Sequence, residues 1–168
     1  MTRALGALLL ALCAAATGLL AARDVRRTGA ALCDLEAACA RMAALMRYQM
    51  PTLPTLLRLS ADGLGAPAAR LLHSAADALE RDAACTCAQA FARAKWPDGL
   101  PPDARRAVSA LAGSLGRTDA EGQLRAIELA ARQLGSVSER FSRERAGRER
   151  SRCALGLGAA LVLMILLR

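Results

Sequence analysis

Apolar positions repeat with helical spacing in two separate parts of the chain. From residue 120 onward they recur at alternating steps of four and three: Ala120, Leu124, Ile127, Ala131, Leu134, Ser138 and Phe141. A repeat of about 3.5 residues places such positions along one face of a helix. A second series with the same steps precedes Tyr48: Leu32, Leu35, Cys39, Met42 and Met46. We therefore expect two long helices that pack side by side and antiparallel.

Both ends of the chain are uncharged and predict membrane segments. The nineteen residues 4–22 contain no charged side chain, and a helix of that length rises about 28 Å, close to the thickness of bilayer hydrocarbon. Residues 153–167 are also uncharged, but rise only about 22 Å, so flanking arginines would have to extend to the headgroups. A cleaved signal peptide is the alternative for the first segment, because Arg3 gives it a positive start.

Arginines on the inner side of both segments set the expected topology. Arg23, Arg26 and Arg27 follow the first segment, and six arginines lie between residues 140 and 152. The positive-inside rule then puts the middle of the chain in the cytoplasm and both termini outside. The predicted parts are an N-terminal transmembrane segment, residues 1–23, a cytoplasmic helical domain, residues 24–152, and a C-terminal transmembrane segment, residues 153–168.

Proline and glycine divide the middle of the chain into four shorter helices between the two long ones. The expected ranges are Pro54–Ala61, Pro67–Asp82, Cys85–Lys95 and Asp103–Leu115. Gly116 suits a left-handed turn at the end of the last of these, and Thr118 with Glu121 has the form of a capping box. The predicted fold is all-α: a six-helix cytoplasmic bundle flanked by N- and C-terminal transmembrane helices, which are continuous with the first and last helices.

Composition agrees with a helical core and argues against nucleic acid as a partner. Hydrophobic residues make up 54% of the chain but aromatic residues only 2%, so a core of leucine and alanine is expected. The net charge of +8 could suit nucleic acid. The arginines, however, gather beside the uncharged ends, without interleaved aromatic side chains for stacking. We attribute the charge to membrane flanks.

Residues that carry chemistry are sparse, and we predict no catalytic, cofactor or metal site. No Gly-rich loop is followed by Gly-Lys-Ser/Thr, and His73 is the only histidine. Cys85 and Cys87 are separated by one residue, which is not the spacing of a zinc ligand pair. We interpret the six cysteines as structural thiols in a reducing compartment. Asp119 and Glu121 point apart on a helix, and acids at a helix start are favoured by the dipole.

One pattern resembles a known family. Leu115-Gly116-x-x-Asp119-x-x-x-Gln123-x-x-x-Ile127, together with the apolar segment that ends at Gly18, the Arg47-Tyr48 region and the apolar tail, is similar to stage III sporulation protein AB. The resemblance implies a helical domain like the F-type platform proteins of type II secretion and type IV pilus systems. It implies a place in the mother-cell-to-forespore channel, in the mother-cell or outer forespore membrane.

The resemblance also implies partners and a candidate site. The partners would be a stage III sporulation AA-type ATPase, other channel subunits and the lipid bilayer, with a homo-oligomer left open. Gly116, Asp119, Gln123 and Tyr48 form the candidate patch. Turn and cap duties explain the first three residue types without a partner, so we favour an architectural role for them.

Three hypotheses follow for the function. The first is a platform that transmits force from the ATPase to the membrane. The second is a membrane-tethered helical adaptor without force transmission, and the third is a secreted, disulfide-bonded helical protein.

Overall fold

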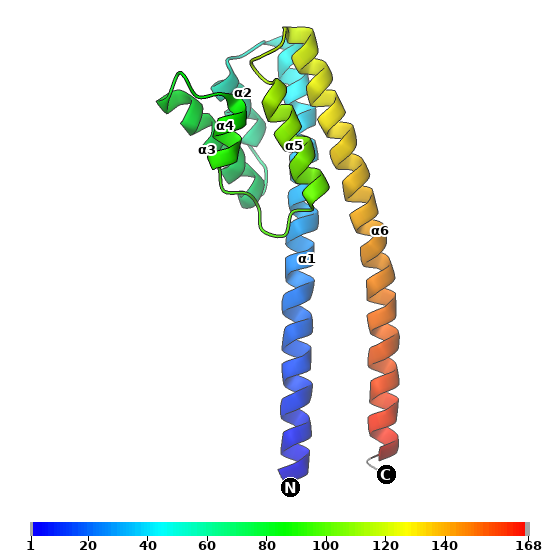
Figure 1. Ribbon diagram of the computed structural model, residues 1–168. Coiled ribbons are helices and arrows are strands. Elements are labelled where there is room, and N and C mark those ends of the chain that lie inside the picture. The colour runs from blue at the N-terminus through cyan, green and yellow to red at the C-terminus, as the bar shows by residue number, and fades with distance from the viewer. Residues whose placement is uncertain (1, 167–168) are drawn as a thin grey trace.

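The computed structural model is an all-helical fold of six helices (Figure 1). It describes the backbone of residues 2–166 and the side chains of residues 23–144, and no strand occurs in that backbone. The helices are α1 (Thr2–Tyr48), α2 (Leu53–Ala61), α3 (Ala66–Arg81), α4 (Cys87–Arg93), α5 (Pro102–Ser114) and α6 (Ala120–Leu166). The prediction of six helices is confirmed, and most ends differ from the expected ones by one or two residues.

The two long helices α1 and α6 lie side by side and antiparallel (Figure 1). The α1–α6 seam is made of the apolar side chains between them. All five predicted seam residues of α1, Leu32, Leu35, Cys39, Met42 and Met46, are buried, as are Ile127 and Leu134 of α6. Ala120 is exposed, because it begins α6. The predicted pairing of the long helices is therefore confirmed.

The four short helices cover one side of α1 and complete the core. α2 and α3 form a hairpin against α1, α5 packs on α6, and α4 links the two groups. Their buried side chains are mainly leucine and alanine, with one phenylalanine: Leu56, Leu57, Leu71, Leu72, Ala75, Ala76, Phe91, Val108, Leu111 and Ala112. Leu59 of α2 is 37% exposed, because α3 covers only one face of that short helix.

Proline and one capping box define where the short helices begin. α2, α3 and α5 each have proline in the first turn, where its missing N–H costs nothing. At α4, the Gln89 N–H donates to Thr86 Oγ1 at 3.3 Å and the Thr86 N–H donates to Gln89 Oε1 at 3.0 Å. This capping box corrects the predicted start of α4 at Cys85: Thr86 is the cap, and the helix begins at Cys87.

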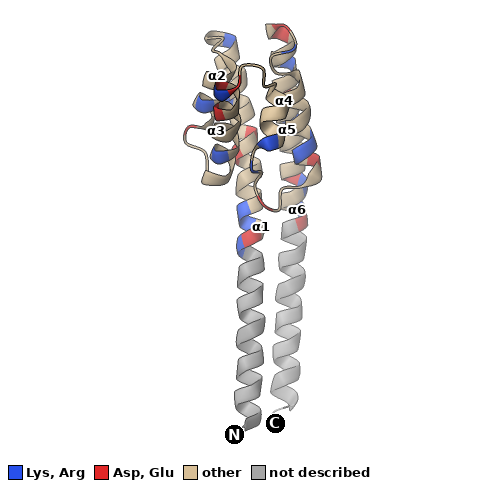
Figure 2. Ribbon diagram, turned by 60° about the vertical axis from the view of Figure 1, so that its left-hand side comes forward, with Lys and Arg blue, Asp and Glu red and all other residues tan. Residues whose placement is uncertain are grey.

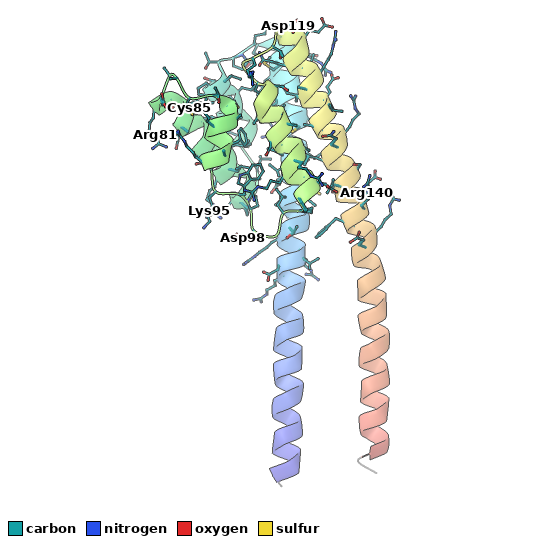
Figure 3. The ribbon with its side chains drawn as sticks, in the orientation of Figure 1. Arg81, Cys85, Lys95, Asp98, Asp119 and Arg140 are labelled. Atoms are coloured by element: carbon teal, nitrogen blue, oxygen red, sulfur yellow. The ribbon has the colours of Figure 1, made fainter. Side chains whose placement is uncertain are left out.

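The bundle has two ends, which we call the base and the tip. The base is the end where Arg23, the 95–99 loop and Arg140 lie, and the tip is the end with the 47–52 and 115–123 segments. Figure 3 shows Asp119 at the tip and Asp98 and Arg140 toward the base. In Figure 2 basic residues of α1 gather at the base, where the described side chains begin.

Within the described part of the chain, residues 23–144, no helix has a stretch that is both long and apolar enough to cross a membrane. The uncharged segments for which we predicted membrane insertion, residues 4–22 and 153–167, lie outside it. At the end of the described side chains, Glu139 and Arg143 of α6 form an i,i+4 ion pair at 2.8 Å.

Candidate functional site

The tip brings together all four residues of the predicted patch. Gly116, Asp119 and Gln123 lie in and after the turn between α5 and α6, and Tyr48 ends α1. The packing of the long helices sets their relative level. Cys33 Sγ lies 3.6 Å from Ser138 Oγ, and a Cβ on Gly135 would lie 3.0 Å from Glu36 Oε1. Continued along both helices at 1.5 Å per residue, this register puts Tyr48 level with Gln123.

Gly116 makes the turn from α5 to α6. Its φ is +75°, a left-handed conformation that favours glycine. A Cβ at this position would lie 2.7 Å from Leu53 Cδ1, closer than carbon atoms approach. Leu115 closes α5 through its N–H, which donates to the Leu111 carbonyl at 3.1 Å. The predicted left-handed turn is confirmed. The close approach to α2 is a second reason for glycine at this position.

Asp119 is the N-cap of α6. Its Oδ1 accepts from the Gly122 N–H at 3.1 Å, and the Gln123 N–H donates to its carbonyl at 2.9 Å. The predicted capping box of Thr118 and Glu121 is wrong, because the helix begins one residue later than that box requires. Thr118 Oγ1 instead donates to the Ser114 carbonyl at 3.4 Å, and Glu121 pairs with Arg125.

Gln123 supports the same turn. Its Nε2 donates to the Thr118 carbonyl at 2.9 Å, which ties the first turn of α6 to the loop before it. Each of the three residues therefore serves the turn. Gly116 sets its handedness, Asp119 caps α6, and Gln123 holds the loop before the helix. These contacts support the architectural interpretation of the three residues.

Tyr48 differs, because it is 85% exposed. The chain reverses directly after it: the Gln49 and Met50 N–H groups both donate to the Leu45 carbonyl, at 2.9 and 3.2 Å. Met50 has φ of +43° and is 66% exposed. The turn thus exposes an aromatic ring and a flexible thioether two residues apart in sequence. Both side-chain types are enriched at protein interfaces.

Charges around the tip are mixed and mostly paired. Arg47 pairs with Glu128 across α1 and α6, and Glu121 pairs with Arg125 along α6. Leu129, beside Glu128, is 50% exposed. The sequence pattern did not identify Met50 as part of this surface, because its exposure follows from the reversal of the chain after Tyr48. Exposed apolar residues near paired charges suit contact with a protein surface.

Two buried cysteines in the described part of the chain have raised pKa values. Burial raises the pKa of the Cys39 thiol to about 12, with a smaller contribution from the charge of Glu36. Burial likewise raises the pKa of Cys87 to about 12, with the neighbouring Cys85 adding to it. Such thiols carry almost no thiolate near neutral pH. Among the described side chains, no group of His, Cys, Asp and Glu could hold a metal ion.

A pair of acids on α3 is held by one arginine of α2. Arg58 donates to Glu80 at 2.7 and 3.0 Å and to Asp77 at 2.6 Å. The hydrogen bonds from Arg58 lower the pKa of the Glu80 carboxyl. The cluster links α2 to α3 at the surface.

The comparisons with known proteins converge on one family. A model of stage III sporulation protein AB matches residues 3–168. A solved structure described as stage III sporulation protein AB is similar to this chain with a TM-score of 0.61 and 18% sequence identity, over 72% of this chain and 98% of that chain. At that identity the likeness shows the fold. No curated protein matches the chain.

Proposed function

The chain belongs to the stage III sporulation protein AB family, and from this we propose a membrane-anchored platform in the mother-cell-to-forespore channel. In this proposal it couples a cytoplasmic ATPase of the stage III sporulation AA type to the membrane assembly. The family is a structural component of sporulation rather than a known enzyme family. One observation carries the coupling: α1 and α6 run without interruption through the domain and pack along each other.

Continuous helices are suited to passing on a displacement. Each long helix has 47 residues and is therefore about 70 Å long. Neither contains proline, the commonest cause of a sharp kink. Buried leucines of the α1–α6 seam each contribute about 1.5–3 kcal/mol of packing, so the two helices move as one body. A load applied at the tip would reach the residues beyond the base with little loss to bending.

The exposed surface of the tip is the proposed contact for the ATPase. Tyr48 and Met50 project there, about 40 Å from Arg23 by helix rise. The uncharged segments 4–22 and 153–167 would enter the membrane, with the basic residues of the base at the cytoplasmic headgroups. The two uncharged ends and the arginines beside them support a location in the mother-cell or outer forespore membrane, with residues 24–152 on the cytoplasmic side.

The coupling is tested by breaking one long helix without disturbing the domain. Gly-Ser-Gly-Ser inserted after Arg23 interrupts α1 at the base, beyond the packed core. We expect heat-resistant spores to fall to the level of a strain that lacks the protein, while the helical content of the purified chain stays unchanged. The matched control carries the same insertion at Ala83, in the exposed loop between α3 and α4. Normal sporulation of the strain with the insertion after Arg23 would favour the tethered adaptor.

The topology is tested with the exposed thiol of Cys33. Cys13 and Cys153 are first replaced by serine, and an impermeant maleimide is added to whole cells. We expect Cys33 to react only after the membrane is permeabilised. Reaction from outside would place the domain on the wrong side for an ATPase. A mature mass that lacks the first residues, together with the absence of free thiols, would instead support the secreted alternative.

A further inference from the structure

A cleft of about 680 Å³ opens at the base of the bundle. Three segments line it: α1 near Arg27, the start of α3 near Arg70, and the loop from Lys95 to Gly99 that joins α4 to α5. Figure 3 shows Lys95 and Asp98 on the side of the domain that faces the base. Neither the predicted patch nor the tip includes any of these residues.

The loop is held firmly against α1, so the cleft is formed without a ligand. Gly99 has φ of +73°, and a Cβ on it would lie 2.9 Å from Thr28 Oγ1. Trp96 Nε1 donates to the Phe91 carbonyl at 3.1 Å, and the Arg105 guanidinium lies 5.0 Å from the centre of the indole ring. With its one donor used and a cation against it, the indole is fixed as a wall of the cleft.

Five charged side chains line the cleft, and none forms an ion pair within the described part of the chain. Three are basic, Arg27, Arg70 and Lys95, and two are acidic, Asp24 and Asp98. Other exposed arginines of the domain, such as Arg47 and Arg58, do have carboxylate partners. The cleft therefore keeps an excess positive charge around a space that no protein group fills.

The remaining lining is mostly apolar: Ala31, Pro67, Trp96 and Pro97, together with Thr28 and Gly99. A cleft with an apolar floor and cationic rim suits a ligand that has both a phosphate and uncharged carbon atoms. Its volume lies in the range of small-molecule sites, about 300–1,000 Å³, and so exceeds the space that one phosphate needs. Two unpaired carboxylates can accept hydrogen bonds from hydroxyl groups next to such a phosphate.

From these contacts we propose that the cleft binds the headgroup of an anionic phospholipid such as phosphatidylglycerol. Arg27, Arg70 and Lys95 hold the phosphate, Asp24 and Asp98 accept from the glycerol hydroxyls, and the Trp96 ring packs against the glycerol backbone. The choice of a lipid over a soluble phosphate ester rests on the proposed function, in which the base faces the bilayer. A lipid bound there would fix the height and rotation of the domain over the membrane.

Trp96 is the only tryptophan of the chain, so its fluorescence reports on the cleft directly. The full chain is kept in a neutral detergent, and phosphatidylglycerol is added as a rising mole fraction of the micelles. We expect a saturable shift of the emission. Phosphatidylcholine at the same mole fractions should give no comparable shift, and neither should soluble glycerol phosphate. An emission shift with glycerol phosphate at equal concentration would identify the ligand as a soluble phosphate ester and would refute the lipid proposal.

Two triple variants separate the cleft from overall charge. In the first, Arg27, Arg70 and Lys95 become Gln; at about fivefold per cation near a lipid surface, the apparent affinity should fall roughly 100-fold. The control changes three exposed arginines outside the cleft, Arg93, Arg117 and Arg132, to Gln. It should bind within about threefold of the parent. Equal losses in both variants, or a shift of equal size with phosphatidylcholine, would refute the site.

The two proposals can fail separately. Insertion after Arg23 tests force transmission in cells and lies outside the cleft lining, whereas the titration needs no ATPase and no sporulation. An emission shift as expected, together with normal sporulation of the insertion strain, would support the lipid site and refute the coupling. Loss of sporulation in the insertion strain, together with no emission shift, would support the coupling and refute the lipid site.

Discussion

Replacing Leu134 with alanine removes a side chain from the middle of the α1–α6 seam. Leu134 is 0% exposed and lies between the two long helices. Leu129, five residues earlier on the same helix, is 50% exposed. The two substitutions delete the same atoms and change helix propensity equally. Any difference between them therefore measures the packing of the seam.

The expected cost at Leu134 is large because a cavity remains. Leu→Ala at fully buried positions costs about 3–5 kcal/mol, the lost transfer free energy plus the cavity term. We expect about 3 kcal/mol here, since two helices can close part of the gap. For a domain of this size about 1 kcal/mol corresponds to roughly 4 °C, so the melting temperature should fall by roughly 12 °C. Leu129→Ala should cost below about 1 kcal/mol.

Thermal unfolding of the full chain in neutral detergent, followed by circular dichroism at 222 nm, measures both variants. Urea unfolding gives the free energies independently. Equal shifts for Leu134→Ala and Leu129→Ala would mean that the seam does not hold the long helices together. The mechanical argument would then lose its physical basis. An intact fold with a weakened seam should also lower spore formation, because the helices would no longer move as one body.

Three further predictions concern single residues. Gly116→Ala should destabilise by about 1–2 kcal/mol, since alanine must take a positive φ and its Cβ meets a leucine of α2. Gly113→Ala, inside α5 with open space around it, should stabilise by about 0.4–1 kcal/mol; a gain at both glycines in urea unfolding would contradict this. Because burial raises the pKa of Cys39 to about 12, that thiol should resist maleimide at pH 8 until the chain unfolds, while exposed Cys33 reacts at once. Mass spectrometry of timed samples distinguishes them, and early modification of Cys39 would refute the burial. The pKa of Glu80 is lowered by its arginine partner on α2, so its stabilisation is present above its ordinary value of 4.5 and is lost as pH falls through the lowered value. In Glu80→Gln, the melting temperature should depend less steeply on pH between pH 3 and 6. An unchanged dependence on pH would count against the ion pair.

Helix ends show what short-range sequence patterns can and cannot predict. The prolines of α2, α3 and α5 marked their starts within one residue, because proline fixes φ and suits the first turn. Caps were harder to assign. Thr118 with Glu121 and Thr86 with Gln89 have equally good capping-box spacing, yet only the second pair forms the box. At Thr118 the next residue, Asp119, competes for the same role and wins.

The candidate site was predictable as separate residues but not as one surface. Gly116, Asp119 and Gln123 were identified from a pattern along thirteen residues, 115–127. Their placement level with Tyr48 depends on the register of α1 against α6, which spans most of the chain. The cleft at the base was not predictable, because its walls come from three segments that only the packed bundle brings together.

The sequence alone determined that this protein is helical, how many helices it has, and which faces of the long helices are buried. These properties follow from local spacing of apolar residues and from proline and glycine, which act within a few residues. Only the tertiary structure decided which residues share the tip, which charges remain unpaired, and where a cleft opens. Those properties depend on contacts between distant segments, whose distances are set by the packing of the whole core.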